Sequence, residues 1–227
     1  MTARVSKGER TRAHLIDTAF RLFEKRGFER TTLREIATRA KVSLGLLYRY
    51  FPSKDALVIE LYERLSLKFE ERSASLPPGP WVLRFVALLG ISLEVLAPHR
   101  EALRAMIPAL AVAPGHPLFI PGGQPSHRRV EARFIEAVRC ATDAPADPEV
   151  FGRRLYLLHL VLVLGFLIDR SEGQQASFEA LGLMGRWAPL FGPLLASPLA
   201  AGFLEPFGQL LERAALGDQA LGAKECG

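Results

Sequence analysis

Five side chains between positions 34 and 54 can donate hydrogen bonds to phosphate oxygens or to the edges of nucleic-acid bases: Arg34, Tyr48, Arg49, Tyr50 and Lys54. Cationic side chains neutralise phosphates, and an arginine can also pair with a guanine edge through two parallel hydrogen bonds. These side chains therefore indicate a surface for a polyanion, provided that the fold presents them together.

The basic residues of the chain gather around this group. Residues 1–54 carry 13 of the 29 lysines and arginines and 5 of the 24 acids, a net charge of +8. Residues 55–227 carry 16 bases and 19 acids, a net charge of −3, so the overall +5 hides a basic head on a slightly acidic body. A basic run can also be a solvated face, so the charge needs a motif beside it.

Helices must position these side chains, because apolar residues recur with helical spacing and no strand-like alternation persists. This pattern predicts an all-α fold. The first helix is expected over residues 10–26 and ends at Gly27. Further helices are expected from residue 53 onward and over 81–97, 98–112, 127–142, 149–170, 177–195 and 200–216, with an irregular Pro- and Gly-rich loop over 108–126.

Two short helices joined by a turn form a helix-turn-helix pattern between residues 32 and 51. Thr32 and Glu35 fit a capping box that opens one helix, and Ser43 caps the next, which Leu47 and Phe51 anchor inside. A helix-turn-helix delivers its second helix to the major groove of DNA. Short helix-turn-helix patterns also occur by chance, so a longer match is needed.

A longer match runs from Arg12 through Leu57 and includes Ala19-Phe20-Arg21-Leu22-Phe23, Gly27-Phe28, Thr31-Thr32, Glu35-Ile36-Ala37, Ala40, Val42-Ser43, Gly45, Leu47-Tyr48, Tyr50-Phe51 and Ser53-Lys54-Asp55-Ala56-Leu57. This segment closely resembles the N-terminal domain of TetR-family (TetR/AcrR-like) transcriptional regulators. The resemblance implies an all-helical homodimer. It has a three-helix DNA-binding domain, here residues 1–54, and a divergent body, residues 55–227, that binds a small molecule.

The resemblance also implies two groups of DNA contacts. The phosphate contacts are Thr32, Tyr48, Tyr50 and Lys54. The base-facing residues are Arg34, Leu44, Gly45 and Arg49, and Ser43 caps the helix that approaches the DNA.

Two residues depart from the family pattern. Lys41 stands in the turn where the family usually has glycine, and a left-handed lysine costs on the order of 1 kcal/mol, which an added phosphate contact can offset. Leu46 replaces a small polar residue, so we do not count it among the contacts.

The apolar run from Leu155 to Ile168 must be covered on every side. We expect the 149–170 and 177–195 helices to form the homodimer interface, and an internal core helix without a partner is the alternative. The run has 14 residues, short of the roughly 20 that cross a bilayer, so no membrane partner is expected.

An effector pocket is expected among the helices of the body, and its apolar composition favours an apolar or aromatic ligand. The candidate lining residues are Trp81, Phe85, Met106, Phe119, Phe134, Tyr156, His159 and Phe166. Ordinary core is the favoured alternative for each of them, because an aromatic residue or methionine at helical spacing needs no ligand to explain it. His159 interrupts the apolar run, so it either bonds to an internal group or supplies the polar end of the pocket.

No catalytic, metal or cofactor site is expected, because the chain has none of the H-E-x-x-H, P-loop, G-x-S-x-G or G-x-G-x-x-G motifs. Its start has no apolar signal stretch, and Cys140 and Cys226 match no disulfide or metal spacing, so a cytoplasmic location is expected. The leading hypothesis is a repressor that an effector releases from a near-palindromic double-stranded operator. The alternatives are an effector-independent architectural DNA-binding protein and a helical small-molecule carrier or enzyme.

Overall fold

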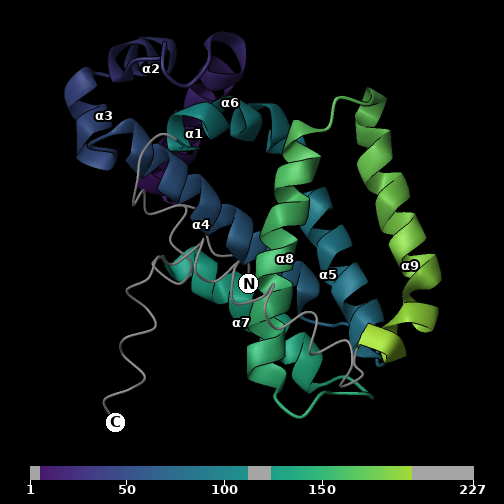
Figure 1. Ribbon diagram of the computed structural model, residues 1–227. Helices are drawn as coiled ribbons and strands as arrows, with labels where there is room; N and C mark the ends of the chain where they lie inside the picture. Colours follow the sequence, from purple (N-terminus) through teal and green to yellow (C-terminus); the bar gives the residue numbers. More distant parts are fainter. Residues whose placement is uncertain (1–5, 112–123, 196–227) are drawn as a thin grey trace, which may run out of the picture. The chain divides into compact units, whose positions relative to one another are not determined.

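A computed structural model of the chain describes residues 6–111 and 124–195, and every regular element within these ranges is a helix (Figure 1). The all-α prediction is therefore confirmed. Phe119 and the helix expected over 200–216 lie outside the described residues. The elements in chain order are α1 (Lys7–Arg26), α2 (Leu33–Arg39), α3 (Leu44–Tyr50), α4 (Lys54–Ser73), α5 (Trp81–Leu96), η1 (Ala97–His99), α6 (Arg100–Ala111), α7 (Pro125–Arg139), α8 (Pro148–Ile168), η2 (Glu172–Gln174) and α9 (Gln175–Leu195).

The described residues form two compact units. Unit 1 comprises those of Met1–Leu65 and Pro98–Pro114, and unit 2 comprises those of Ser66–Ala97 and Gly115–Gly227. The helix α4 is continuous and contributes to both units. The boundary expected after residue 54 falls at the start of this helix and stays a prediction.

Unit 1 is built on α1, which starts three residues earlier than expected because Ser6 and Glu9 form a capping box. The Ser6 hydroxyl accepts a hydrogen bond from the Glu9 amide at 3.1 Å, and the Glu9 carboxylate accepts one from the Ser6 amide at 2.7 Å. Gly27 ends the helix with a positive φ of 84°, which suits a residue without Cβ.

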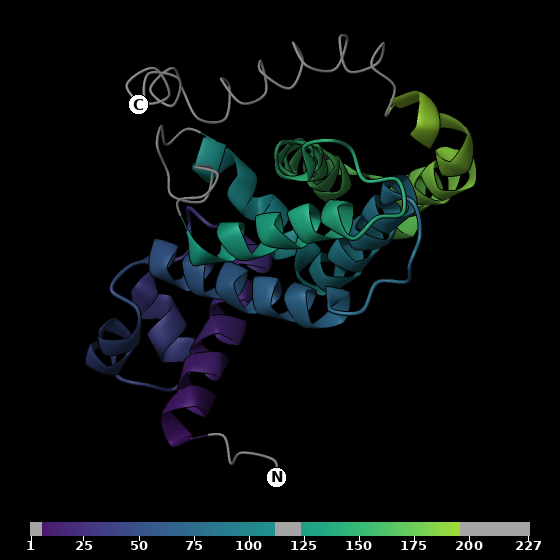
Figure 2. The same ribbon diagram turned by 90° about the horizontal axis from the view of Figure 1, so that it is seen from below.

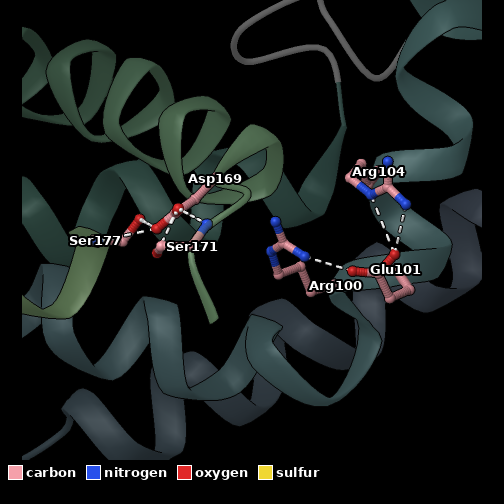
Figure 3. A network of polar contacts seen from close by, with 6 residues as sticks. All are labelled: Arg100, Glu101, Arg104, Asp169, Ser171 and Ser177. Carbon is pink, nitrogen blue, oxygen red and sulfur yellow. Dashed lines mark hydrogen bonds and ion pairs between the residues drawn. The ribbon is translucent and has the colours of Figure 1, made fainter. Parts of the chain in front are cut away.

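A second part of unit 1 comes from α6, which packs against α1. Leu103 and Met106 of α6 are buried, with exposed fractions of 2% and 0%. On the outer side of α6, Glu101 pairs with both Arg100 and Arg104, and the Arg104 Nη2 lies 2.7 Å from the carboxylate (Figure 3). Met106 thus belongs to unit 1.

Unit 2 is centred on α7 and α8, which approach each other closely at Gly152. A Cβ at this position would lie 2.6 Å from Ile135 Cα, so only glycine permits this backbone contact. Phe134 lies at the middle of the core with 1% of its surface exposed. Packing against α5 and α9 completes this unit.

The start of α9 is fixed by Asp169, just after the end of α8. Its carboxylate accepts hydrogen bonds from the amides of Ser171 at 2.8 Å and Ser177 at 3.0 Å, and from both hydroxyls (Figure 3). These bonds, led by that of the Ser177 hydroxyl, lower the pKa of Asp169. These hydrogen bonds of the Asp169 carboxylate explain why α8 ends at Ile168 and not at residue 170, as was expected.

Two helical stretches have the length and composition of membrane spans. These are Trp81–Ile107 and Pro148–Ile168, each with a peak mean hydropathy of 1.7. The helix α8 has 21 residues, but its first turns contain Glu149, Arg153 and Arg154, so the uncharged apolar run within it is still the 14 residues from Leu155 to Ile168. Core helices of soluble proteins meet the same criteria, and Leu155, Tyr156 and Phe166 of α8 are buried inside unit 2.

Candidate DNA-binding surface

The turn between α2 and α3 is held by backbone hydrogen bonds. The Ala40 amide donates to the Ile36 carbonyl at 2.8 Å, and the Val42 amide donates to the Ala37 carbonyl at 3.0 Å. Lys41 has a φ of 57°, so the left-handed conformation expected at this position is present. The lysine therefore carries the strain of roughly 1 kcal/mol that a glycine would avoid.

Both helices of the motif are capped by hydroxyls. The Thr32 hydroxyl accepts from the Glu35 amide at 3.2 Å, and the Glu35 carboxylate accepts from the Thr32 amide at 3.0 Å. The Ser43 hydroxyl accepts from the Leu46 amide at 3.1 Å. The hydrogen bond from the Thr32 amide is the main reason why the pKa of Glu35 is lowered, and Arg26 adds to the effect.

The helix α3 has an anchoring side and an outward side. Leu47 and Phe51 are buried, with exposed fractions of 0% and 1%. Gly45 and Arg49 are exposed, and half of the Tyr48 surface is accessible. The anchors fix the helix and leave this side open to a ligand.

The two arginines of the surface, Arg34 on α2 and Arg49 on α3, are both exposed. Neither side chain makes a hydrogen bond or ion pair with another residue in the described part of the chain. By contrast, Arg12 and Arg26 pair with Glu60 and Glu35. The charges of Arg34 and Arg49 are therefore available for phosphates or base edges.

Lys54 has contacts that the sequence did not suggest. Its Nζ donates hydrogen bonds to the carbonyls of Phe28 at 2.8 Å and Glu29 at 3.3 Å, and it lies 4.4 Å from the centre of the Phe28 ring. The ammonium thus ties the first turn of α4 to the loop after α1. One of its three donors is left for a phosphate.

Three further residues that were expected to contact DNA differ in their exposure and in their surroundings. Thr32 is exposed, but its hydroxyl serves as the helix cap described above. Tyr50 is half-buried, and its hydroxyl lies beside Gly8 in the first turn of α1. Leu44 is also half-buried, at the first position of α3.

Two exposed cations lie beside the turn: Lys41, for which the sequence analysis raised an added phosphate contact, and Arg39, which it did not consider. Arg39 ends α2, and Lys41 follows in the left-handed position. Both are exposed, and their side chains have no hydrogen-bond or ion-pair partner among the residues that the structure describes. A signal was present in the sequence, since both lie within the helix-turn-helix pattern itself.

Most of the expected pocket residues meet in the core of unit 2. Trp81, Phe85, Phe134 and Tyr156 belong to one buried cluster. The His159 ring joins it, with its centre 4.8 Å from that of Phe134. Met106 lies in unit 1, so it does not belong to this cluster.

His159 makes the internal hydrogen bond that was one of its two expected roles. Its Nε2 lies 2.8 Å from the Ser92 hydroxyl of α5, and its Nδ1 is buried with no hydrogen-bond partner in the described chain. Burial lowers the pKa of His159 to about 3. The imidazole is therefore neutral at physiological pH.

A cleft of 360 Å³ lies between α5, α8 and α9. Phe166 lines it, whereas the other described pocket candidates do not. Its walls are mainly Leu89, Leu93, Val161, Leu162, Phe166, Leu181 and Met184, and Asp169 and Ser177 are polar lining residues. The sequence analysis thus identified an aromatic core, but Phe166 is the one residue among those lining this cleft that it named.

Both α8 and α9 carry exposed large apolar side chains. Leu158, Val161, Leu164 and Ile168 of α8 have between 36% and 57% of their surface exposed. On α9, Phe178, Leu183, Trp187 and Leu190 have between 37% and 65% exposed. Exposed apolar surface of this kind is typical of a protein–protein interface.

Comparison with known proteins gives a consistent result. Residues 15–61 match the profile of "Bacterial regulatory proteins, tetR family". An HTH-type transcriptional regulator of Mycobacterium bovis is 31% identical over 160 residues, which cover 70% of this chain and 72% of that protein. The match therefore extends well beyond the helix-turn-helix.

Other relatives match over shorter segments. The repressor KstR of Rhodococcus jostii is 38% identical over 30% of this chain and 32% of its own length. The regulator AcrR of Shigella flexneri is 34% identical over 44% of this chain and 49% of its own length. The chain thus spans less than half the length of these curated relatives.

Solved structures share the fold. A TetR transcriptional regulator from Nitrosomonas europaea has a TM-score of 0.60 at 23% identity, over 79% of this chain and 98% of that one. A regulator of the same family from Streptomyces coelicolor has a TM-score of 0.56 at 22% identity, over 90% of this chain and 88% of that one.

Proposed function

The chain belongs to the TetR family of helix-turn-helix transcriptional regulators, and we propose that it is a repressor that a small apolar or aromatic effector releases from its operator. Members of this family are DNA-binding regulators and not enzymes. Several relatives are named repressors, KstR among them. The repressor assignment rests on these names together with the surface on α2 and α3.

The observation that carries the proposal is the pair of exposed arginines, Arg34 and Arg49. Their side chains have no partner in the described chain, and they lie on a helix-turn-helix whose second helix is fixed by Leu47 and Phe51. When an arginine side chain without an internal partner binds a phosphate or a guanine edge, no intramolecular contact has to be broken, so none of the binding free energy is offset.

We assign the DNA contacts by kind. Thr32, Tyr48, Tyr50 and Lys54 contact phosphates, with Lys54 sharing its ammonium with the Phe28 and Glu29 carbonyls. Arg34, Leu44, Gly45 and Arg49 face the bases, and Ser43 caps the helix that carries three of them. Gly45 has open space where a Cβ would be, so DNA can approach the backbone there.

TetR regulators bind DNA operators as dimers. We propose that the second copy covers the exposed apolar side chains of α8 and α9, since these two helices of unit 2 carry the eight large ones named above. The paired recognition helices would then read a near-palindrome with half-sites about 34–36 Å apart or a multiple of that. TetR-family regulators are soluble DNA-binding proteins, which supports a cytoplasmic location without a membrane partner.

The effector is proposed to be apolar or aromatic and uncharged. The aromatic core around Phe134 and the cleft at Phe166 both have mainly apolar walls. His159 is neutral and Asp169 is anionic, so neither favours a carboxylate or phosphate ligand. An effector-independent architectural protein is the competing function, and its melting temperature would not respond to small molecules.

The test starts by selecting binding sites from random-sequence DNA with the full chain. We expect a near-palindromic site bound by two copies, with an affinity that falls linearly on a log–log plot against salt concentration. The Arg34→Ala/Arg49→Ala variant should lose its preference for the selected site over unrelated DNA. Arg170→Ala, which changes an exposed arginine of unit 2, is the matched control and should bind normally.

Binding without any preferred sequence would contradict the proposal and favour an architectural role. Loss of preference in the Arg170→Ala control would show that net charge, not the helix-turn-helix surface, sets the affinity.

A further inference from the structure

The helix α9 packs along α5, where a glycine on each helix allows a close approach. A Cβ at Gly90 of α5 would lie 3.3 Å from Leu181 Cδ2, and one at Gly185 of α9 would lie 3.6 Å from Val86 Cγ1. Figure 2 shows α9, in yellow-green, beside α5, in blue. At Gly165 of α8, by contrast, a Cβ would meet no described atom within 4 Å. The 360 Å³ cleft between α5, α8 and α9 lies over this glycine, which is one of its lining residues.

The cleft reaches into the core of unit 2. Leu89 and Leu93 of α5 are each 3% exposed and Phe166 of α8 is 1% exposed, although all three line it. Val161 and Gly165 of α8 are exposed and line it as well, so they lie where it opens to solvent. A hollow with a buried apolar floor surrounds a small molecule on several sides, which a flat apolar surface does not.

The cleft is separate from most of the apolar side chains that we assign to the dimer. Of the eight exposed side chains on α8 and α9, Val161 is the one that lines the cleft. A second copy can therefore cover the other seven without filling the hollow between the helices. This separation favours a small molecule over a second copy as the occupant of the cleft.

The size of the cleft limits the size of its ligand. A cavity of about 150 Å³ in a protein core holds benzene, so 360 Å³ has room for about 14 non-hydrogen atoms at the same density. The lining residues extend from Val161 to Asp169 on α8 and from Ser177 to Met184 on α9. At 1.5 Å per residue these stretches are about 10–12 Å long. This volume, spread over this length, favours an elongated molecule such as one ring with a short alkyl chain.

The polar groups of the cleft lie together at the start of α9. Each oxygen of the Asp169 carboxylate accepts two hydrogen bonds, from the amides and hydroxyls of Ser171 and Ser177 (Figure 3). These bonds occupy the roughly four acceptor sites of a carboxylate, and its negative charge disfavours an anionic ligand.

The Ser177 hydroxyl is the acceptor that remains for a ligand. It donates its proton to Asp169 at 2.6 Å, and no other group in the described part of the chain donates to its oxygen. A hydroxyl has two acceptor lone pairs besides its one donor. A ligand that carries a hydroxyl at one end can therefore donate a hydrogen bond to Ser177 Oγ while its apolar part lies along the cleft.

We propose that the cleft between α5, α8 and α9 is the effector site and that it binds an elongated, uncharged molecule with a terminal hydroxyl, of the alkylphenol class. The ring and alkyl chain lie against the buried floor of Leu89, Leu93 and Phe166, and the hydroxyl donates to Ser177 Oγ. The role as effector site rests on the proposed function, whereas the binding itself requires no DNA.

The experiment titrates the full chain with 4-pentylphenol in a calorimeter. Two matched compounds test the polar end: 4-pentylanisole has no hydroxyl donor, and 4-pentylbenzoate is an anion. The position of the probe is read from nuclear Overhauser contacts to ¹³C-labelled methionine methyl groups. Met184 lines the cleft, whereas Met106 lies in unit 1 and serves as the internal reference.

A glycine-to-leucine substitution fills the cleft without a clash. Gly165→Leu places a side chain in the open space over α8, and leucine also favours the helix more than glycine does. Gly182→Leu on α9 is the matched control, because a Cβ there also meets no described atom within 4 Å and Gly182 is not among the lining residues. Circular dichroism checks that both variants keep their helical content.

We expect 4-pentylphenol to contact the methyl group of Met184 and not that of Met106. The anisole should bind roughly two- to tenfold more weakly, as expected for the loss of one hydrogen bond, and the benzoate more weakly still. Gly165→Leu should lose measurable binding, and Gly182→Leu should keep the wild-type affinity. The probe should lower the affinity of the wild type for the selected operator and leave that of Gly165→Leu unchanged.

Three results would overturn the inference. Binding that survives in Gly165→Leu would place the ligand elsewhere, for example in the aromatic core around Phe134. Equal affinity for the phenol and the benzoate would contradict the assigned chemistry. Absence of binding, together with a weaker dimer of Gly165→Leu in sedimentation equilibrium, would assign the cleft to the second copy.

The proposed function can fail separately from this inference. If the probe occupied the cleft without any change in operator affinity, the binding site would stand and release by an effector at this site would be contradicted. If the wild-type protein bound no preferred DNA sequence, the proposed repressor function would fail, while the calorimetric and Overhauser results would still decide whether the cleft binds the probe.

Discussion

Lys54 and Phe28 are 26 positions apart in the chain, yet the Lys54 ammonium donates to the Phe28 carbonyl at 2.8 Å and lies 4.4 Å from the centre of its ring. The contact joins the start of α4 to the loop that follows α1. A lysine expected to contact only phosphate therefore also stabilises the domain that presents the recognition helix.

Replacing Lys54 with alanine should lower both stability and DNA affinity. We expect the free energy of unfolding to fall by about 1–2 kcal/mol, since a cation–π contact and two hydrogen bonds are lost together. Urea denaturation followed by circular dichroism measures this change. Lys68→Ala, an exposed lysine farther along α4, should leave stability unchanged. A Lys54→Ala protein of wild-type stability would reduce the residue to a phosphate contact.

Replacing Arg49 with alanine should relax sequence discrimination. If Arg49 pairs with a guanine, the variant loses about 1–3 kcal/mol of preference at one base pair of the operator and little elsewhere. The measurement is a binding titration against operators substituted at each position. Uniform weakening across all sequences would instead make Arg49 a phosphate contact.

Replacing Lys41 with glycine should stabilise the protein and weaken DNA binding slightly. Its φ of 57° is strained for lysine and free for glycine, so we expect a gain of about 1 kcal/mol in the free energy of unfolding. Loss of one cation near the DNA should reduce the slope of log affinity against log salt by about one. Gln174→Gly, with the same φ of 57° in unit 2, is the control: it should gain stability without a change in DNA binding.

His159 should make stability depend on pH. Its pKa is lowered from 6.5 to about 3 in the folded chain, so below pH 6.5 the unfolded state binds a proton that the folded state does not. Stability should therefore fall as the pH drops from 6.5 toward 3, by about 2 kcal/mol at pH 5. Denaturation of His159→Gln should lack this slope, whereas the exposed His14→Gln should keep it. An unchanged slope in His159→Gln would assign the effect to another group.

Replacing Leu183 with glutamate should weaken the dimer. Leu183 has 51% of its surface exposed on α9, and a carboxylate there would have to be desolvated in the proposed interface. Sedimentation equilibrium should show a shift toward monomer. Leu67→Glu, on an exposed apolar residue of α4 with 48% of its surface accessible, should stay dimeric. A dimeric Leu183→Glu protein would move the interface away from this part of α9.

Much of the fold could be predicted because helices are encoded by neighbouring residues. The capping box at Thr32 and the cap at Ser43 were predicted from residue spacing alone, and both are present. The left-handed conformation of Lys41 fits the glycine that the resembled family usually has in this turn. The missed start of α1 at Lys7 had the same kind of signal, a Ser-x-x-Glu pattern at Ser6 and Glu9.

The same difference between local and long-range contacts decides how much of the candidate sites could be predicted. The sequence by itself determined that α3 carries an exposed, basic and aromatic face, because the period of 3.6 residues separates Arg49 from the anchors Leu47 and Phe51. It also identified the aromatic residues that form one core in unit 2. It did not identify most of the walls of the cleft at Phe166, since these come from three helices far apart in the chain.

Only the tertiary structure decided what the polar groups do inside the body. The pairings of Ser92 with His159, 67 positions apart, and of Ser73 with Arg133, 60 positions apart, depend on how helices pack, and no local pattern specifies them. A capping hydroxyl finds its partner within one helical turn, whereas a buried arginine or histidine finds its partner wherever packing places an acceptor. Short-range hydrogen bonds are thus readable from sequence, and long-range ones require the fold.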